Sequence, residues 1–371
     1  MFNSMCETEV FVCGGGPAGL AAAIAARLAG FEVTVADCAQ PPIDKACGEG
    51  VMPDGLAALQ KLGVRLRPDQ GLPFPGIRFI DADGLSEACF PDGLGFGVRR
   101  PLLHQALIDR AEELGIAMHW GARVSALSSK GVSINGHTIR SRWVVGADGQ
   151  QSKLREFAGL AAERRFRCRF GFRRHYRLAP WTDFVEVHWS DVGQMYVTPV
   201  GPDELCMAFI THHFDMRFDE ALPFFPEVCR RVARAEFTRV KGAVTSTRKL
   251  NAVQNNRIAL VGEASGSVDA LTGEGLALAF QQAEALASAM QNDNLSLYEA
   301  AHRRISRLPL FMSELMLAMD EHPKFRRRVF RAFAAEPKLF PRLLAMHTGA
   351  ISPTQFGLRG TLSLGWQLLT A

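Results

Sequence analysis

Apolar positions near the N-terminus follow the period of a strand, then of a helix, then of a second strand. Glu9 to Cys13 is a short run of strand type, and it leads directly into a glycine-rich turn over residues 14–19. An alanine-rich segment follows and ends near Gly30, and Phe31 to Ala36 is a second apolar run. Strand patterns that alternate with helical patterns favour a parallel sheet, so we predict an α/β unit here.

A different pattern fills the middle of the chain, where apolar and polar residues alternate as in half-buried strands. It occurs in Phe166 to Arg177, Thr182 to Ser190, Gln194 to Val200 and Glu204 to Thr211. Turn sequences separate these segments at Asp191-Val192-Gly193 and Gly201-Pro202-Asp203. We therefore predict a mostly antiparallel sheet, to which Ile77 to Phe90 adds an edge hairpin.

From about Tyr298 onward the pattern becomes helical. One broad face carries Leu308, Leu310, Phe311, Leu315 and Met316. Further on, Arg326, Arg327, Arg328, Arg331, Lys338 and Arg342 lie among Phe325, Phe330, Phe333, Phe340 and Leu343. Two interpretations are open: the apolar face packs on the N-terminal α/β lobe, or the stretch 324–342 contacts a membrane surface or an acidic carrier protein.

Composition places the chain among ordinary globular proteins. The 371 residues are 47% hydrophobic and 22% charged, which is enough for a large core and for two lobes. No run of about 18 uncharged apolar residues occurs, and Met1 to Glu9 lacks a basic stretch followed by an apolar one. We therefore expect a cytoplasmic protein. The net charge of +4 is too small to indicate nucleic-acid binding.

Eight cysteines occur singly along the chain, at Cys6, Cys13, Cys38, Cys47, Cys89, Cys168, Cys206 and Cys229. They lack the Cys-x-x-Cys and His-x-x-x-His spacings that build metal sites, so no metal is expected. Most are expected to be reduced core residues.

The glycine-rich turn has the G-x-G-x-x-G arrangement of a dinucleotide-binding loop. Gly14 permits the tight turn, Gly16 lets a pyrophosphate approach the backbone, and Gly19 allows the helix to pack closely on the strand. Pro17 and Ala18 stand in the first helical turn, where the missing N–H of proline costs nothing. These residues predict a pyrophosphate site.

Asp37 closes the second predicted strand. A carboxylate at this position is placed to hydrogen-bond the adenosine ribose hydroxyls, and it disfavours a 2′-phosphate. A strand before the glycines, a helix after them and an acid closing the next strand make the fingerprint specific.

Two later segments indicate FAD rather than NAD. Residues 143–154 (WVVGADGQQSKL) are a buried strand followed by a turn containing Asp148 and Gly149. Residues 257–276 (RIALVGEASGSVDALTGEGL) are a strand, a Gly262-Glu263 turn and a second glycine pair, Gly273 and Gly275, before an alanine-rich helix. Each acidic turn can place N–H groups and a carboxylate beside a polyol or diphosphate. FAD is long enough to need such supports.

These motifs resemble those of the glutathione-reductase-type flavoproteins, which include para-hydroxybenzoate hydroxylase-like monooxygenases, flavin-dependent halogenases and geranylgeranyl reductases. The resemblance is carried by Gly14, Gly16, Gly19, Asp37, Asp148, Gly149, Gly262 and Glu263. The family usually has Glu where Asp37 stands and Asp where Glu263 stands, and both exchanges keep an acid. The resemblance implies non-covalent FAD in a Rossmann-like lobe, with the antiparallel sheet covering the isoalloxazine.

Val98 to Ala111 resembles the family's helix that begins with an arginine contacting FAD. Arg100 has the matching spacing to Leu103 and Leu107, and Arg99 is the alternative. Only one complete glycine fingerprint is present, so a two-dinucleotide disulfide reductase is not expected. By the resemblance, NAD(P)H binds transiently as the reductant, or a partner reductase supplies the electrons.

Two short segments resemble geranylgeranyl reductases in particular. Lys45 to Gly50 resembles their Cys-Gly-x-Gly segment, and Leu271 to Gly275 resembles their Leu-Thr-Gly-Glu-Gly turn, whose backbone can face the flavin and stabilise its reduced form. Cys47 is either a redox or proton-transfer group near the flavin or an inert buried thiol. Gln194 to Pro199, however, keeps only the proline of their Tyr-x-Trp-x-Phe-Pro pattern, and a halogenase-like Trp-x-Trp-x-x-Pro segment is absent too.

We therefore favour an FAD-dependent monooxygenase of secondary metabolism that hydroxylates an apolar aromatic small molecule, phenolic in type, with NAD(P)H and O2. The expected substrate is an apolar aromatic or lipid-like compound. Cys47, Tyr196 and His188 are the catalytic candidates, and His175, His212 and His213 are further acid–base candidates in the sheet. The alternatives are an FAD-dependent reductase or dehydrogenase acting on carbon–carbon double bonds and a non-catalytic flavin-holding partner subunit.

The expected fold class is α/β, with a Rossmann-like FAD-binding lobe, a mostly antiparallel substrate lobe and a helical C-terminal segment. The FAD-binding domain is predicted over residues 1–73, 98–165 and 250–300. The substrate-binding sheet is predicted over 74–97 and 166–249, and the helical segment over 301–371.

Overall fold

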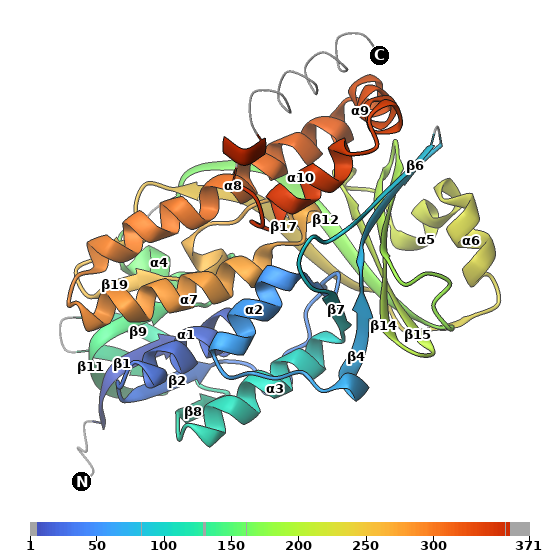
Figure 1. The fold of residues 1–371 in the computed structure, drawn as a ribbon. Coiled ribbons are helices and arrows are strands. Elements are labelled where there is room, and N and C mark those ends of the chain that lie inside the picture. Colours follow the sequence, from blue (N-terminus) through green and yellow to red (C-terminus); the bar gives the residue numbers. More distant parts are fainter. Residues whose placement is uncertain (1–5, 83, 129–130, 161, 353, 357–371) are drawn as a thin grey trace.

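Two sheets of unlike strand direction form the two lobes of the molecule (Figure 1). The computed structural model describes residues 6–82, 84–128, 131–160, 162–352 and 354–356. The ends of the chain, 1–5 and 357–371, which the predicted FAD domain and helical segment include, lie outside these residues. The α/β fold class is confirmed, whereas the predicted domain boundaries stay a prediction.

The N-terminal lobe is built on a sheet of order β18-β19-β11-β1-β2-β8, with β9 and β10 attached through β11. Its strands are β1 (Cys6–Cys13), β2 (Val33–Asp37), β8 (Ala117–Trp120), β9 (Val124–Ser128), β10 (Gly131–Ile134), β11 (His137–Gly146), β18 (Gln254–Asn255) and β19 (Ile258–Leu260). β1 pairs in parallel with β2 and β11, and β11 pairs in parallel with β19.

Both faces of this parallel sheet are buried, as expected for strands covered by crossover helices. Val10 and Val12 of β1 pack into the core formed with the helices on one face. Phe11 and Cys13 point to the other face and pack with β9 and β10. The main helices of the lobe are α1 (Pro17–Leu28), α2 (Pro53–Lys61), α3 (Arg100–Glu113), α4 (Lys153–Phe157) and α7 (Gly275–Gln291).

The register of the parallel strands brings three of their carboxyl ends to one edge. Cys13 at the end of β1 is paired with Gly146 at the end of β11, and Gly146 is paired with Leu260 at the end of β19. The three turns predicted to hold the dinucleotide follow these three residues directly. Because the ends of parallel strands meet at one edge, the turns lie side by side, which is where open α/β sheets bind ligands.

The second lobe is an eight-stranded sheet of order β16-β12-β15-β14-β13-β5-β6, with β17 paired to β12. Its strands are β5 (Gly76–Asp81), β6 (Gly84–Cys89), β12 (Ala162–Arg177), β13 (Val185–Ser190), β14 (Gly193–Gly201), β15 (Glu204–Thr211), β16 (Glu236–Phe237) and β17 (Lys241–Leu250). The predicted hairpin at Ile77–Phe90 is present, but β5 joins β13 in parallel, so the sheet is not purely antiparallel.

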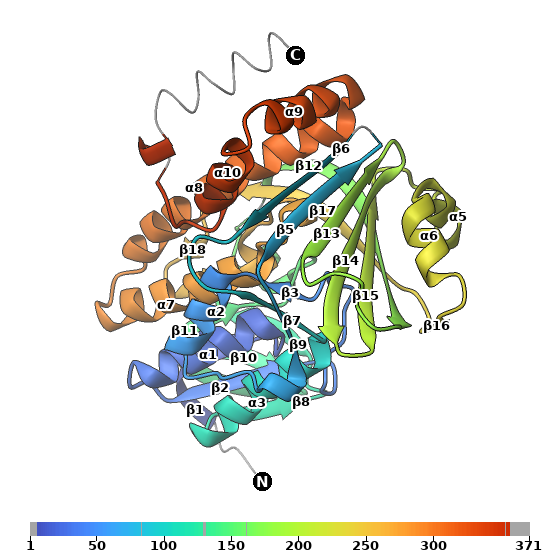
Figure 2. The same cartoon turned by 45° about the vertical axis from the view of Figure 1, so that its right-hand side comes forward.

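Helices cover this sheet, and a smaller one links the lobes. On one side lie α5 (Phe218–Ala221) and α6 (Pro226–Val232), as Figure 2 shows. Helices α8 (Leu295–Glu321), α9 (Pro323–Ala335) and α10 (Leu339–His347) pack against β5, β6 and β13. A three-stranded sheet of β3 (Gly50–Val51), β7 (Gly95–Val98) and β4 (Gly71–Phe74) lies between the lobes.

Helices α9 and α10 correct the expectation that the apolar face of 324–342 packs on the FAD lobe, whereas α8 does pack against α7 of that lobe. Phe330, Phe333 and Phe340 are buried in a core shared with Phe79 and Val187 of the sheet lobe. Arginines 327, 328 and 331 are exposed, as the packing interpretation requires, whereas Arg326 is buried and pairs with Asp81 and Asp191. Within the described residues, no helix is both long enough and apolar enough to cross a membrane.

The cysteines also depart from expectation. The seven whose side chains are described are free thiols, and only Cys13 and Cys206 are buried. Cys38, Cys89 and Cys168 are exposed, so the prediction that most cysteines are core residues is wrong.

Candidate functional site

The first glycine loop is fixed by backbone contacts that leave one glycine open to the cavity. Gly14 has φ +112°, and a Cβ atom there would lie 2.4 Å from the carbonyl oxygen of Ala147 in the second turn. A Cβ atom on Gly19 would lie 1.7 Å from the carbonyl oxygen of Gly14. Gly16 has no atom within 4 Å of the Cβ position and lines the cavity. The first and second motifs therefore touch at Gly14, while Gly16 leaves room for a ligand.

Asp37 and an unforeseen histidine hold this loop in shape. The carboxylate of Asp37 accepts hydrogen bonds from the N–H groups of Gly15 (2.6 Å) and Ala39 (2.7 Å). His104 accepts from the N–H of Ile43 at Nδ1 and donates from Nε2 to the carbonyl of Gly15 (2.7 Å). Burial lowers the pKa of His104 and keeps it neutral. Each Asp37 oxygen keeps further acceptor capacity for a ribose hydroxyl.

The second turn uses its acid differently from the prediction. The Asp148 carboxylate accepts hydrogen bonds from the Ser152 hydroxyl and from the N–H groups of Lys153 (2.8 Å) and Leu154 (3.1 Å). The side chain of Asp148 therefore satisfies free backbone N–H groups at the start of α4. Asp148 also lines the cavity. A Cβ atom on Gly149 would lie 3.9 Å from Oε2 of Glu263, so the second and third turns adjoin.

The third motif contacts the first through Gly262. Its N–H donates to the side-chain oxygen of Gln282 (2.8 Å), and a Cβ atom on Gly262 would lie 2.6 Å from Cβ of Ala18 on α1. Glu263, the next residue, lines the cavity together with Pro17 and Ala18. The three acidic glycine turns thus meet around one space.

The second glycine pair opens α7 at the cavity wall. Gly273 has φ +70°, a conformation that favours glycine, and neither it nor Gly275 has an atom within 4 Å of its Cβ position. Both residues line the cavity. The free N–H groups at the start of α7 therefore face a space where negative charge is stabilised.

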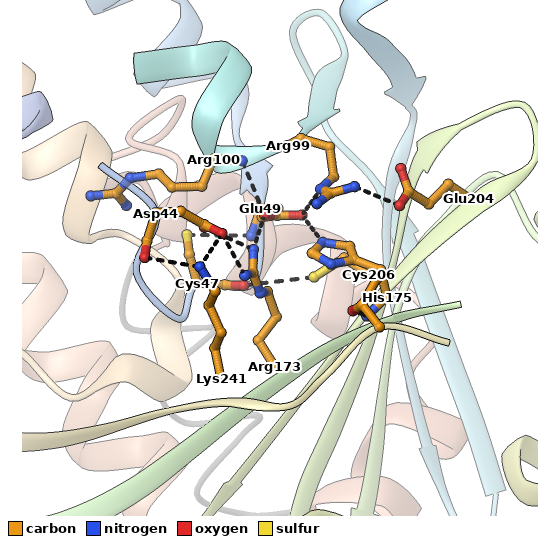
Figure 3. A network of polar contacts seen from close by, with 11 residues as sticks. Asp44, Cys47, Glu49, Arg99, Arg100, Arg173, His175, Glu204, Cys206 and Lys241 are labelled. Carbon is orange, nitrogen blue, oxygen red and sulfur yellow. Dashed lines mark hydrogen bonds and ion pairs between the residues drawn. The ribbon is translucent and has the colours of Figure 1, made fainter. Parts of the chain in front are cut away.

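Arg99 and Arg100 have separate roles. Arg99 donates from Nη1 to Glu204 (2.5 Å) and lies 3.7 Å from Glu49. The backbone N–H of Arg100 donates to Glu49 (3.0 Å), while its side chain extends away from Glu49 (Figure 3). Nε of Arg100 is buried without a partner, and the residue lines the cavity. Of the two, Arg100 is free to meet a ligand.

All of these groups surround one cavity of about 730 Å³. The open positions at Gly16, Gly273 and Gly275 and the unpaired Nε of Arg100 fit an extended anionic dinucleotide.

Comparisons with known proteins agree with this geometry. Residues 7–190 match the family model of the FAD binding domain. A menaquinone reductase of Mycobacterium tuberculosis is 29% identical over 307 residues, covering 73% of each chain. An FAD-dependent monooxygenase of Beauveria bassiana, OpS4, is 32% identical over 40% of this chain and 38% of its own. Residues 7–190 therefore form an FAD binding domain, and the relatives of this chain include FAD-dependent monooxygenases and geranylgeranyl reductase-like proteins.

A solved structure supports the same fold. A flavoprotein/dehydrogenase of Cytophaga hutchinsonii matches with a TM-score of 0.83 at 16% identity, over 98% of this chain and 100% of its own. The protein is an FAD-dependent oxidoreductase, and NAD(P)H is typical of its family. In this family FAD supplies the hydride or activates oxygen. The assignment of Gly16–Ala18, Asp37, Arg100, Glu263, Gly273 and Gly275 to parts of FAD stays a prediction.

A buried charged network, centred on Glu49, fixes the loop before β3 (Figure 3). The carboxylate of Glu49 accepts a hydrogen bond from Nη1 of Arg173 (2.7 Å) and contacts Nε2 of His175 (2.6 Å). Arg173 also donates to both carboxylate oxygens of Asp44. Burial alone would raise the pKa of Glu49, but the hydrogen bond from His175 and the charge of Arg173 hold the pKa below its usual value. We call Asp44, Glu49, Arg173 and His175 the clamp network.

Part of this network also has the composition of a metal site. Ligand atoms of Glu49, His175 and Cys206 lie within 4.8 Å of one another. The Glu49 carboxylate is already engaged by Arg173, whose positive charge opposes a cation. Burial raises the pKa of Cys206 well above its usual value, so its thiol keeps the proton that metal binding would have to displace. The donor set therefore fits an ion-pair network better than a metal.

The three predicted catalytic residues are placed differently. Cys47 lines the cavity, and its Sγ accepts a hydrogen bond from the N–H of Glu49 (3.4 Å), so its role stays a prediction. Tyr196 also lines the cavity, but its hydroxyl donates to the carbonyl of Leu271 (2.7 Å). Burial raises the pKa of Tyr196, so the phenol stays neutral and braces the turn that contains Leu271.

The position of His188 argues against its predicted catalytic role. Val185 and Val187 of β13 line the cavity, and strand alternation turns His188 to the other face, where Nε2 contacts Glu186 (2.9 Å). His175 belongs to the clamp network. His212 and His213 stack on each other, and neither is among the described residues that line the cavity.

Several functional residues have no signal in the sequence. His104, Gln282 and Glu49 hold the loops around the cofactor end of the cavity through contacts between segments far apart in the chain. Only the position of His104 one turn after Arg100, in a helix resembling a known motif, could have drawn attention to it.

Proposed function

We propose that this protein is an FAD-dependent reductase that saturates a carbon–carbon double bond in a long, apolar, polyprenyl-like molecule. The observation that carries the proposal is the apolar wall that the C-terminal helices contribute to the cavity. NAD(P)H, typical of the family, is the proposed transient reductant.

This wall is contributed by the C-terminal helices. The cavity-lining residues of α8, α9 and α10 are Met312, Leu315, Met316, Met319, Phe333, Phe340, Leu343, Leu344 and His347. All but His347 are apolar, and Phe79, Val185 and Val187 of the sheet face the same space. Methionine and leucine side chains adapt to flexible apolar chains, and burial of each CH₂ group contributes about 0.8 kcal/mol.

The contacts of the predicted catalytic residues Tyr196 and His188 do not support phenol hydroxylation. A hydroxylase of phenols needs a group that binds or deprotonates the ring hydroxyl. Tyr196 is bonded to Leu271, and His188 points away from the cavity. The similarity to a menaquinone reductase over 73% of each chain also supports the reductase, which the sequence favoured only as an alternative.

Hydroxylation of an apolar aromatic compound is the second candidate. It is favoured by the 32% identity to the monooxygenase OpS4, which is confined to 40% of this chain. A flavin-holding subunit without its own activity is the third, and steady turnover by the isolated chain would exclude it.

Product analysis under controlled oxygen separates these functions. Purified protein, NADPH and a prenylated naphthoquinone in detergent micelles are incubated with and without O2, and the product is examined by mass spectrometry. We expect, in the absence of O2 and after re-oxidation of the head group to the quinone, a product heavier by two hydrogen atoms that fragmentation places in the prenyl chain. A product heavier by one oxygen atom, formed only with O2, would replace the reductase by the hydroxylase.

The exposed basic side chains of α9 suggest how an apolar substrate reaches the cavity. Lys324, Arg327 and Arg328 are exposed on the helix whose Phe333 lines the apolar wall. The predicted membrane or carrier-protein contact through 324–342 therefore remains a proposal, now restricted to this basic face because the aromatic face is buried.

A further inference from the structure

A buried acid cluster adjoins the cavity at the start of α7. Glu274, the N-cap residue of α7, has a side chain only 4% exposed, and its Oε1 lies 3.5 Å from Nδ1 of His347 at the end of α10. Asp54 of α2 is the third member, because its charge acts on both groups. We call Asp54, Glu274 and His347 the acid cluster.

Each member of the acid cluster keeps a polar atom without a hydrogen-bond partner. These buried atoms are Oδ1 of Asp54, Oε2 of Glu274 and Nδ1 of His347. Among the ion pairs between described residues, neither carboxyl is paired with a lysine or arginine. An unsatisfied buried polar group costs about 1–3 kcal/mol, so three in one place are not explained by stability.

The contacts define where the protons lie. Nε2 of His347 is 3.2 Å from the carbonyl oxygen of Thr272, which can only accept, so Nε2 carries the hydrogen and Nδ1 is the free acceptor. Burial raises the pKa of Glu274 well above its usual value, and burial lowers the pKa of His347. A protonated Glu274 facing a neutral His347 is consistent with both the geometry and these directions.

We propose that Glu274 and His347 act together as the proton donor to the substrate in the cavity. His347 lines the cavity, whereas Glu274 lies behind it. This inference rests on the proposed reductase function, since saturation of a double bond adds a hydride to one carbon and a proton to the other.

The transfer balances within the cluster. The Nε2–H group of His347 exchanges the carbonyl oxygen of Thr272 for the substrate carbon. Its N–H bond breaks as the new C–H bond forms, and the acid proton of Glu274 moves to Nδ1. His347 stays neutral but now carries its hydrogen on Nδ1, and Glu274 is a carboxylate. A solvent proton taken up at Nε2, with return of the Nδ1 proton to Glu274, restores the starting state. Asp54 is a positioning residue: its charge raises the pKa of Glu274 further after burial and so favours this return.

The principal test is Glu274→Gln, which keeps the shape and neutrality of the acid but removes its proton. We expect kcat to fall by about 10²–10⁴-fold with little change in KM, FAD content or the rate of flavin reduction by NADPH. Glu274→Asp should restore part of the loss. In the wild type kcat should fall as pH rises through the raised pKa of Glu274, and this slope should be absent in Glu274→Gln.

His302→Gln is the matched control. His302 is also a buried histidine, and its pKa is lowered to about 4 by burial, but it bonds to Ser265 and does not line the cavity. Its turnover should stay within about threefold of the wild type. Values of kcat for Glu274→Gln within about threefold of the wild type would overturn the proposal.

A measurement without turnover separates this inference from the proposed function. The ¹⁵N NMR shifts of His347 should show a neutral ring with hydrogen on Nε2 at neutral pH. A charged ring, or hydrogen on Nδ1, would overturn the donor pair even if the wild type reduces the substrate. Failure of the wild type to saturate the prenylated quinone would instead reject the reductase, whatever the state of His347.

Discussion

Two buried clusters of titratable side chains flank the same cavity, and they differ in whether their buried carboxyl groups have cationic partners. In the clamp network the carboxylate of Glu49 meets Arg173 and His175 at hydrogen-bond distance. In the acid cluster Glu274 meets a neutral histidine at 3.5 Å, the hydroxyl of Thr272 and a second carboxyl, and it has no cationic partner among the ion pairs of the described residues. The pKa of Glu49 is therefore lowered, while the pKa of Glu274 is raised.

This difference separates a structural role from a chemical one. A buried carboxylate with cationic partners stabilises the charged form and fixes the loop that carries it. A buried carboxyl without a cation keeps its proton and can give it up, as a catalytic acid must. Burial alone therefore does not reveal the role of a carboxyl, whereas its partners do.

The largest expected effect is loss of FAD from the cavity that both clusters adjoin. Gly16→Val places a side chain in the open space before α1, so the purified protein should be folded but nearly colourless. Gly84→Val, at an exposed position on β6 with no atom near its Cβ, is the control and should keep its FAD. Flavin released on heating is measured by absorbance; a yellow Gly16→Val protein would refute this placement of the pyrophosphate.

The next largest effect is expected in the clamp network. Glu49→Gln leaves Arg173 and His175 without their shared carboxylate, and breaking a buried pair costs about 3–5 kcal/mol. The exposed pair of Glu236 and Arg177 gives the control Glu236→Gln, expected to cost less than about 1 kcal/mol. Urea unfolding measures both. Equal costs would mean that the clamp network does not hold the fold.

Acid should reduce the contribution of Glu49. Its folded pKa lies below the ordinary value of 4.5, so its stabilisation is fully present above 4.5 and is lost as pH falls through the folded pKa. The difference in unfolding free energy between wild type and Glu49→Gln should therefore shrink below about pH 4. A difference that instead grows in acid would contradict the charged state of Glu49.

The acid cluster should respond with the opposite sign. Because the folded pKa of Glu274 is raised, its presence costs stability as pH rises above 4.5. At neutral pH, Glu274→Gln should raise the unfolding free energy by about 0.5–2 kcal/mol while turnover falls, a trade-off typical of functional sites. Destabilisation by this variant at neutral pH would place Glu274 with the clamp network.

Tyr196→Phe should have the smallest effect. It removes one hydrogen bond to the carbonyl of Leu271, worth about 0.5–1.5 kcal/mol. Because the phenol braces the turn and stays neutral, steady-state kcat should remain within about threefold of the wild type. A loss of about 100-fold or more would restore Tyr196 to the catalytic role that the sequence predicted.

Much of the fold could be predicted because its signals are local. Neighbouring residues carry the strand-turn-helix pattern around Gly14–Gly19 and the alternation of apolar and polar residues in Glu204–Thr211. The strand predicted from that alternation, β15, has the predicted bounds. The parallel pairing of β5 with β13 was missed, because strands far apart in the chain leave no trace of their pairing in the pattern of either. The packing side of the C-terminal helices was missed for the same reason.

In the candidate site, too, the residues fixed by local backbone geometry could be predicted, whereas those defined by tertiary contacts could not. Its glycines could be predicted, because backbone geometry near a phosphate restricts the residue type at each position. The spacing to Leu103 and Leu107 favoured Arg100 over Arg99 in the sequence. The contact of Arg99 with Glu204, which leaves the side chain of Arg100 free, could not be predicted. His188 and Tyr196 were plausible by residue type alone, and their hydrogen-bond partners argue against the role.

The sequence by itself determined the α/β class, the three acidic glycine turns and the cofactor, because these depend on residue type at short spacing. Only the tertiary structure decided which acids are paired with cations, which histidine faces the cavity and which helices line its apolar end. Electrostatic environment and burial depend on neighbours in space, and Asp54, Glu274 and His347 become neighbours only when α2, α7 and α10 pack together.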